Sequence, residues 1–379
     1  MSLVNLKFNV EDQPEFYNEL RKRVNFYFTD NKISKYANKS MKVKTAFMLI
    51  IYFVPLILMV SGIITGLWTI IGLWAIMGFG MAGIGLSIMH DANHGSYSRS
   101  KKVNEVFGFM LNFIGGYHIN WKIQHNVLHH SYTNIHGFDE DIDKPLMRFS
   151  PNQERKSYYK FQAFYAPFLY GLMTIFWLFV KDFDQLIKYN KMGLLAGQGL
   201  SLRKAILHVF FNKAWYLALF VALPMMVLGL AWWQTLLGFL LMHFICGLIL
   251  AFVFQPAHII GETKFYIPDS EASVENNWAI HQLLTTCNSA HGSTSFSWFI
   301  GGLNYQIEHH LFANICHVHY KKISPIIKHT ALEYGLPYHQ HRTFLGALKS
   351  HFTLLNALGT GKYDKDLVAK EPPISVAAA

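Results

Sequence analysis

Long, nearly uncharged stretches constrain this chain more than any other feature. They are residues 44–66, 67–89, 213–232 and 234–257. Each has about the 20 residues that a helix needs to cross a hydrocarbon core roughly 30 Å thick. The 379 residues are 52% hydrophobic and only 15% charged, which is typical of a membrane protein rather than of two or three soluble domains. We therefore predict an all-α integral membrane protein with four transmembrane helices.

Three clusters of histidine lie just outside these apolar stretches. They are HDANH at 90–94, HNVLHH at 125–130 and QIEHH at 306–310. Residues four apart project from one face of a helix, so His90 with His94, and His125 with His129, can each offer two imidazole nitrogens to one metal ion. Burying so many imidazoles without a shared partner would leave polar nitrogens unsatisfied. We predict that the clustered histidines are metal ligands.

The number and type of these ligands also bear on the metal. Zinc sites close with three or four protein ligands, so a larger set suits two ions. An all-imidazole donor set allows iron, zinc or copper, and the chain has neither an H-E-x-x-H helix nor a C-x-x-C pair. Dioxygen chemistry at a pair of irons fits best. More isolated histidines are expected to be hydrogen-bonded structural residues, namely His118, His136, His208, His243, His281, His291, His317 and His319.

A fifth apolar run, residues 161–180, is also long enough to span a membrane. The first two histidine clusters follow the second predicted span, and the third cluster follows the fourth. One metal site can receive all three clusters only if an even number of crossings separates them. We therefore predict that 161–180 is an interfacial helix, which its Tyr and Trp content suits.

Charge predicts the orientation. Lys and Arg are concentrated in the first 44 residues, in 99–212 and after 320, whereas the hairpin tips near 66 and 233 carry none. By the positive-inside tendency, the termini and the histidines form a cytoplasmic helical cap that holds the dimetal site, on the inner membrane if the source is bacterial. No signal peptide is expected in the polar first 40 residues. The net charge of +10 suits a face held against anionic lipid, an acidic electron carrier or a phosphate-bearing substrate.

HDANH, HNVLHHSYTN and NYQIEHHLF, in that order and separated by apolar hairpins, resemble the three histidine boxes of the membrane fatty acid desaturase family. Gln306 stands where many members have the first histidine of the third box. This substitution resembles the front-end acyl desaturases, which insert a double bond between an existing one and the carboxyl end. The stretch HYKKISPIIKHTALEYGLPY also resembles that branch, so the likeness runs from about residue 45 to 345.

The resemblance implies one more ligand at the cytoplasmic end of the last span, where His258 lies in FQPAHII. The implied ligands, which are also the implied catalytic residues, are His90, His94, His125, His129, His130, His258, His309 and His310. Gln306 could bind a metal weakly or orient a neighbour. Candidates to hydrogen-bond the ligating imidazoles, or else to be solvated surface residues, are Asp91, Asn126, Asp139, Asp143 and Glu308.

By resemblance, two iron ions act with O2 as co-substrate, and two hydrogens leave neighbouring methylenes to give a cis double bond. The fatty acyl substrate could be carried on coenzyme A, a carrier protein or a glycerolipid. The chain lacks the His-Pro-Gly-Gly haem motif of a fused cytochrome b5 domain. Electrons are therefore expected from a separate carrier such as a ferredoxin or cytochrome b5. We expect the protein to contact membrane lipid and not to bind nucleic acid.

The expected organisation is a cytoplasmic N-terminal segment at 1–43, a desaturase domain at 44–345 and a C-terminal tail at 346–379. Two alternatives stay open at this point. The same diiron scaffold serves hydroxylases of alkyl or carotenoid substrates. A non-enzymatic membrane protein could also use histidines to hold a metal or haem, although such ligands would lie within the spans, whereas these lie beyond them.

Overall fold

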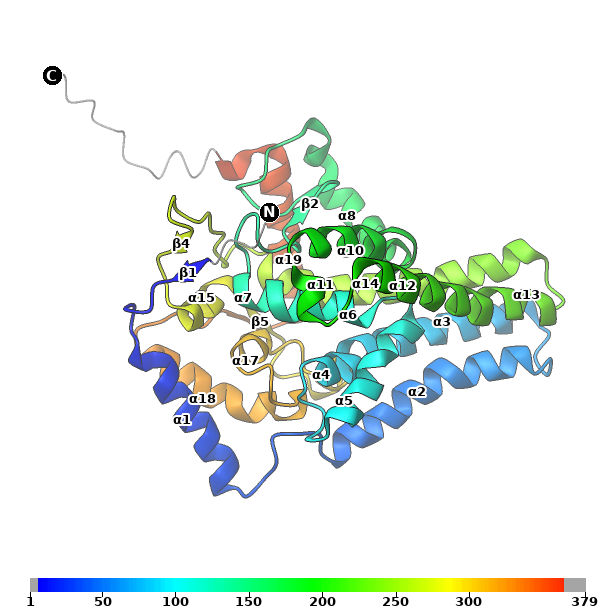
Figure 1. The fold of residues 1–379 in the computed structure, drawn as a ribbon, viewed down its shortest axis with the longest axis horizontal. Helices are drawn as coiled ribbons and strands as arrows, with labels where there is room; N and C mark the ends of the chain where they lie inside the picture. Colours follow the sequence, from blue (N-terminus) through cyan, green and yellow to red (C-terminus); the bar gives the residue numbers. More distant parts are fainter. Residues whose placement is uncertain (1–5, 365–379) are drawn as a thin grey trace.

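Long helices form a bundle at one end of the molecule, and shorter helices form a cap at the other (Figure 1). The computed structural model describes residues 6–364. Four helices are long and apolar enough to cross a membrane. They are α2 (Lys39–Val60), the continuous helix Leu67–Asn93, the continuous helix Leu202–Val227, and α14 (Trp232–His258). The prediction of four transmembrane helices in an all-α membrane protein is confirmed.

Two of the spans contain π-helical turns. The second span consists of α3 (Leu67–Gly83), the π-helical turn η1 (Ile84–Ile88) and α4 (Met89–Asn93). The third consists of α12 (Leu202–Leu217), the π-helical turn η6 (Ala218–Ala222) and α13 (Leu223–Val227). Such turns insert an extra residue into a helix and are frequent near functional sites. The turn η1 lies directly before the first histidine cluster.

Small residues allow the spans to pack closely. A Cβ at Gly78 would lie 2.8 Å from the carbonyl oxygen of Met242 on α14, and one at Gly80 would lie 2.8 Å from the backbone nitrogen of Tyr52 on α2. Because these helices touch backbone to backbone, side chains larger than hydrogen would push α3 away from both neighbours. The glycines before the first histidine cluster therefore serve helix packing.

The third span begins earlier than the predicted boundary at 213. Its helix starts at Leu202, and Lys213 lies inside it. The Lys213 ammonium forms a buried ion pair with Asp182 and donates to the carbonyl oxygen of Gly115 at 2.6 Å. The predicted span began at this lysine because a charged residue usually marks the end of an apolar segment. Here the charge is neutralised by Asp182, so the helix extends past it on both sides.

The apolar run at 161–180 is not one straight helix. Two helical pieces, Ser157–Gly171 and Met173–Lys191, meet at an angle of 62°. The outward side chains of Phe164 and Phe168 are exposed, which suits the predicted interfacial position. Two straight spans already separate the second histidine cluster from the third, and those clusters meet at one site. The bent pair therefore does not add a complete crossing.

The remaining helices build the cap and the bent segment. In the first half of the chain they are α1 (Glu15–Asp30), α5 (Lys101–Gly108), η2 (Phe109–Ile114), α6 (His118–Trp121), η3 (Lys122–His129), α7 (His130–Tyr132), η4 (Ser157–Phe161), α8 (Gln162–Gly171), α9 (Met173–Phe176), η5 (Trp177–Lys181), α10 (Asp182–Lys191) and α11 (Leu194–Gly197). In the second half they are α15 (Trp278–Thr285), α16 (Thr294–Phe299), α17 (Gln306–Leu311), η7 (His317–His319), α18 (Tyr320–Glu333) and α19 (Phe344–Thr360).

Short strands tie distant segments of the cap together. They are β1 (Lys7–Phe8), β2 (Asp143–Lys144), β3 (Met147–Arg148), β4 (Ser273–Val274), β5 (Asn288–Ser289) and β6 (Gln340–His341). The N-terminal strand β1 pairs in parallel with β4, and β5 pairs in parallel with β6. The segment between the fourth span and the third histidine cluster is therefore fastened to both ends of the chain.

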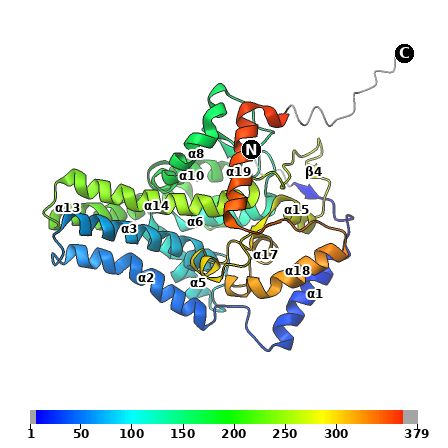
Figure 2. The ribbon, with the colours of Figure 1, turned by 180° about the vertical axis from the view of Figure 1, so that it is seen from behind.

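The predicted C-terminal tail begins inside a helix. Helix α19 buries Leu354, Leu355 and Leu358 in a core that it shares with α8 and α14 (Figure 2). Its His351 lies 2.7 Å from the hydroxyl of Tyr170 and donates a hydrogen bond of 2.7 Å to the carbonyl of Ile259. The boundary predicted at 345 therefore does not coincide with the end of the packed structure, and the last residues of the tail lie outside the described range.

Candidate metal centre

Four parts of the fold bring the clustered histidines to one buried site between the bundle and the cap. His90 lies on α4 and His94 caps that helix, while His258 is the last residue of α14. His125 and His129 belong to the π-helical turn η3, and His130 begins α7. His309 and His310 lie on α17. All eight histidines predicted as ligands therefore meet, although they are spread over more than half of the chain.

One group of ring nitrogens comes from His90, His94, His125 and His309, and these atoms lie within 4.8 Å of one another. Both nitrogens of His90 and the Nε2 of His94 are buried without a hydrogen-bond partner among the described residues. Buried polar atoms are rarely left unpaired in this way, because each one costs free energy. Ring nitrogens that lie this close together, with those of His90 and His94 lacking a protein partner, fit a metal ion.

A second group comes from His129, His258 and His310, with ligand atoms again within 4.8 Å of one another. The Nε2 atoms of His310 and His258 are 3.2 Å apart. Two deprotonated ring nitrogens repel at that distance, so a cation between them would relieve the contact. The residues present therefore fit two metal positions rather than one.

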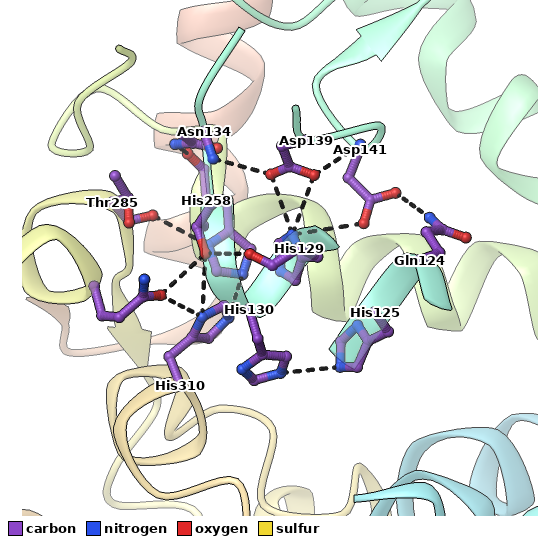
Figure 3. Close-up of polar contacts among 12 residues, drawn as sticks. Gln124, His125, His129, His130, Asn134, Asp139, Asp141, His258, Thr285 and His310 are labelled. Carbon is purple, nitrogen blue, oxygen red and sulfur yellow. Dashed lines mark hydrogen bonds and ion pairs between the residues drawn. The ribbon is translucent and has the colours of Figure 1, made fainter. Parts of the chain in front are cut away.

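His130 lies between the two groups. Its Nε2 is 3.3 Å from the Nε2 of His125 and 2.9 Å from that of His309, and its ring stacks on His310 with centroids 4.4 Å apart. Figure 3 shows His130 pointing into the space between His125 and His310. The two candidate metal positions are therefore adjacent, and His130 contacts histidines of both groups.

The four-residue spacing predicted that His125 and His129 would serve one ion, and the structure places them differently. Their rings stack with centroids 5.4 Å apart, yet His125 belongs to the first group and His129 to the second. Both rings lie on one side of the π-helical turn, but their neighbours differ, because His125 meets the first and His129 the second of the two groups of ring nitrogens. His90 and His94 do serve one group, as predicted.

The outer nitrogens of the ligands are held by the protein, which fixes which nitrogen faces inward. His310 donates from Nδ1 to the side-chain oxygen of Gln282 at 2.8 Å, and His258 donates from Nδ1 to the carbonyl of Thr285 at 3.1 Å (Figure 3). The Nδ1 of His309 lies 3.2 Å from the hydroxyl of Tyr320. Partners of this kind set the tautomer and the orientation of a metal-binding imidazole.

His129 has a carboxylate partner. Its Nδ1 donates to Asp139 at 3.1 Å and lies 3.7 Å from Asp141. Burial alone would lower the pKa of His129, but the negative charges of Asp139 and Asp141 outweigh it and raise the pKa. The opposite holds for His94 and His309, where burial and then the neighbouring histidines lower the pKa well below its usual value. Most of these imidazoles are therefore neutral at pH 7, as metal ligands must be.

Of the residues predicted to hydrogen-bond the ligating imidazoles, Asp139 does so, because it accepts from the Nδ1 of His129. Asp91 lies 3.8 Å from the Nδ1 of His90, and its closer partner is the Nδ1 of His317 at 2.8 Å. Asn126 instead donates to the backbone carbonyl of Asn93 at 2.9 Å. Asp91 and Asn126 thus brace the backbone and neighbours of the first cluster rather than its ring nitrogens.

Two other predicted supporting residues lie away from the ring nitrogens. Asp143 is exposed on β2. Glu308 is buried and accepts hydrogen bonds from Tyr338 at 2.6 Å and Asn288 at 2.7 Å, so it anchors α17 to the segments around it. Sequence reasoning missed the residues that do contact ligands, namely Asp141, Gln282, Thr285 and Tyr320. None of them belongs to a histidine motif, so the sequence carried no signal for them.

Gln306 begins α17, three residues before His309 and therefore on the same side of that helix. Its Nε2 is buried without a hydrogen-bond partner among the described residues. Its amide nitrogen is therefore one of the few buried side-chain polar atoms near the third histidine cluster that no described residue satisfies.

The isolated histidines behave largely as structural residues. His243 lies 2.9 Å from the hydroxyl of Tyr216, and His281 donates to the carbonyl of Thr133 at 2.7 Å. His317 is different, because it belongs to a separate buried cluster with Asp91 and Cys316. Its Nε2 lies 2.6 Å from the ammonium of Lys44, so a cationic side chain already occupies that cluster.

The comparisons with known proteins agree with this geometry. A family model described as fatty acid desaturase matches residues 66–342. The sn-1 linoleoyl-lipid 6-desaturase of Arthrospira platensis is 35% identical over 90% of this chain and 92% of its own length. The enzyme of the same name from Synechocystis is 33% identical over 91% and 95%. The acyl-lipid (8-3)-desaturase of Physcomitrium patens is 33% identical over 95% of this chain and 75% of its own length.

The predicted resemblance is thereby confirmed, including the front-end branch. Three histidine motifs, carried by membrane helices and by the cap, meet in one buried centre, and the family model spans all three. An oxidoreductase that desaturates fatty acyl chains accounts for both observations. This chain belongs to the fatty acid desaturase family.

Proposed function

We propose that this protein is an O2-dependent, front-end acyl-lipid desaturase whose eight clustered histidines hold two iron ions. The observation that carries the proposal is the convergence of those histidines into two adjacent groups of ring nitrogens. Imidazole donors hold iron while leaving coordination positions open for oxygen. When bound, iron supplies the oxidising power, drawn from O2, that removes two hydrogens from unactivated methylene carbons.

The ligand sets follow the two groups. His90, His94, His125 and His309 form the first set, and His129, His258 and His310 form the second. His130 lies against both. The protein's own contribution is to orient these rings, because Gln282, the Thr285 carbonyl and Asp139 each hold an Nδ1–H and leave the Nε2 free to face inward.

Gln306 would be at most a weak ligand to iron. An amide oxygen binds iron more weakly than an imidazole does, so a glutamine at this place leaves the first group one strong donor short.

The substrate is an acyl chain on a membrane glycerolipid, and the new double bond lies on the carboxyl side of an existing one. Support comes from relatives named linoleoyl-lipid 6-desaturase and acyl-lipid (8-3)-desaturase. The site also lies where the apolar spans end, which is the depth at which acyl chains of membrane lipids are within reach.

The active side faces the cytoplasm, and electrons come from a separate carrier such as a ferredoxin or cytochrome b5. The hairpin tips, residues 61–66 and 228–231, carry no Lys or Arg, and they lie at the end of the bundle farthest from the histidines (Figure 1). Basic residues are concentrated in the cap, which suits the positive-inside tendency and an acidic electron donor.

The test is expression in a host that lacks polyunsaturated fatty acids, followed by gas chromatography of its lipids after feeding linoleate. We expect a new double bond on the carboxyl side of C9, most simply at C6, found in glycerolipids rather than in the free acid. His94→Ala should abolish it, whereas His329→Ala, which removes an exposed histidine, should not. Hydroxylated products would contradict the desaturase proposal, and a bond toward the methyl end would contradict the front-end part alone.

A further inference from the structure

A groove runs along the side of the bundle between the start of α2 and helix α5, separate from the metal centre. Its volume is about 740 Å³, and its walls come from residues 34–49 and 97–107. α5 and the beginning of α2 lie side by side at the end of the bundle that carries the histidines (Figures 1 and 2). The groove therefore opens at the level where the first span enters the membrane.

The groove changes from cationic to apolar along its length. Lys42 lies near the start of α2, Ala46 follows about one turn later and Leu49 about another turn later. This places the lysine and the leucine about 10 Å apart along the helix axis. The opposite wall, on α5, contributes Val103 and Phe107. The change occurs over the distance that separates the phosphate layer of a membrane from its acyl chains.

The cations at the outer end are not neutralised by the protein. Lys42 and Arg99 line the groove, and neither has a carboxylate within 4.0 Å among the described residues. Lys101, which does not line the groove, pairs with Glu105. The guanidinium carbon of Arg99 lies 5.9 Å from the ring centroid of Tyr36, which holds it at the rim. Two cations that line one groove without a carboxylate partner, together with an apolar wall, complement an anionic amphiphile.

The floor of the groove lies against the metal-bearing helix. Tyr97 and Thr45 lie on the floor, with their hydroxyl groups 3.0 Å apart. Tyr97 packs in a buried cluster with Ala92 of α4, two residues after His90. A molecule in the groove would therefore rest on the back of the helix that carries the first histidine cluster, without entering the centre itself.

We propose that this groove binds an anionic glycerophospholipid, with its phosphate between Lys42 and Arg99 and one acyl chain along the apolar wall. The site is distinct from the metal centre and does not depend on which metal that centre holds. The bound lipid fills the gap between α2 and α5 and so supports the first histidine cluster from outside.

Native mass spectrometry of the purified protein tests this proposal, with phosphatidylglycerol and phosphatidylcholine of the same acyl chains titrated separately. The variant K42Q/R99Q should bind phosphatidylglycerol roughly 25-fold more weakly, because each cation near an anionic headgroup contributes a factor of about five. The matched control is R203Q/K204Q, which removes two exposed cations at the start of the third span. It should retain the wild-type affinity.

A second pair of variants tests the apolar part without changing charge. Ala46→Trp fills the groove and should displace the lipid, whereas Val43→Trp, on an exposed position of the same helix outside the groove, should not. Equal loss in K42Q/R99Q and R203Q/K204Q would overturn the proposal, since it would show diffuse attraction. Wild-type affinity in Ala46→Trp, or equal binding of phosphatidylcholine, would also overturn it.

Discussion

Gln282 accepts a hydrogen bond from the Nδ1 of His310 across 2.8 Å, although the two residues belong to different helices of the cap. The same oxygen also accepts from the hydroxyl of Thr133, just after the second histidine cluster. One amide therefore sets the position of a ligand from the third cluster relative to the backbone of the second. Its role is to orient, since its oxygen contacts the outer nitrogen of the ring.

Replacing Gln282 with Leu should lower the affinity for iron or the activity by about 10- to 100-fold, and with it the iron content, because His310 loses the acceptor that fixes its tautomer. Gln282→Glu keeps an acceptor and should retain more of both. Gln198→Leu, at an exposed position, serves as the control. Iron per chain and product formation are the measurements, and an unchanged iron content in Gln282→Leu would contradict the assigned role.

His94→Ala and His310→Ala should each reduce the iron content below two per chain, since each removes a ligand from a different group. Mössbauer spectra of the 57Fe-loaded protein would show whether the remaining iron is altered differently in the two variants. His329→Ala should leave both iron content and spectrum unchanged. Zinc as the only metal that restores turnover to the chelated wild type would rule out the diiron assignment.

Tyr338→Phe should destabilise the protein by about 1–3 kcal/mol, because it leaves the buried Glu308 carboxylate short of a hydrogen bond of 2.6 Å. Glu308 is fully buried, so water does not readily replace the lost donor. Tyr334→Phe is the matched control, since it lies in the same EYGLPY stretch and its hydroxyl has no partner in residues 6–364. Thermal unfolding in detergent compares the two, and equal melting temperatures would contradict the anchoring role.

Lys213→Met should be among the most destabilising single changes, at about 3–5 kcal/mol, because it leaves Asp182 buried without its ion-pair partner. Adding Asp182→Asn should recover part of the loss, since the uncompensated charge is then removed. Lys204→Met, on the exposed side of the same helix, should have little effect. Additive losses in the double variant would show that the two side chains do not act as a pair.

Membrane topology can be tested with single cysteines at exposed sites. Ile63→Cys and Ala231→Cys, at the hairpin tips, should react with a membrane-impermeant thiol reagent from the outside of intact cells. Glu154→Cys and Lys322→Cys should react only after the membrane is permeabilised. The native cysteines Cys246, Cys287 and Cys316 are buried and should contribute little background. Labelling of positions 154 and 322 from opposite sides would contradict the even number of crossings between them.

The sequence predicted the membrane fold and, together with the family resemblance that implied His258, the eight histidines that meet at one site. Apolar length and clustered histidines are local signals, so both can be recognised without the fold. Two kinds of feature were not predictable. Lys213 looked like the end of a span, since its partner Asp182 is far away in the sequence and meets it only in the folded chain. Gln282 and Tyr320 gave no signal for a related reason, because ordinary polar residues become supports only when folding brings them to a ligand.

The π-helical turn that carries His125 and His129 means that the length of this segment matters as much as its composition. Removing one residue between His125 and His129 would shorten their spacing to three and rotate one ring relative to the other, so the two would no longer reach their separate groups as they do here. Such a deletion would leave every histidine and every span in place while changing which ring nitrogens lie together. In an alignment of relatives, a gap at this turn would therefore mark a change in how the histidines divide between the two groups.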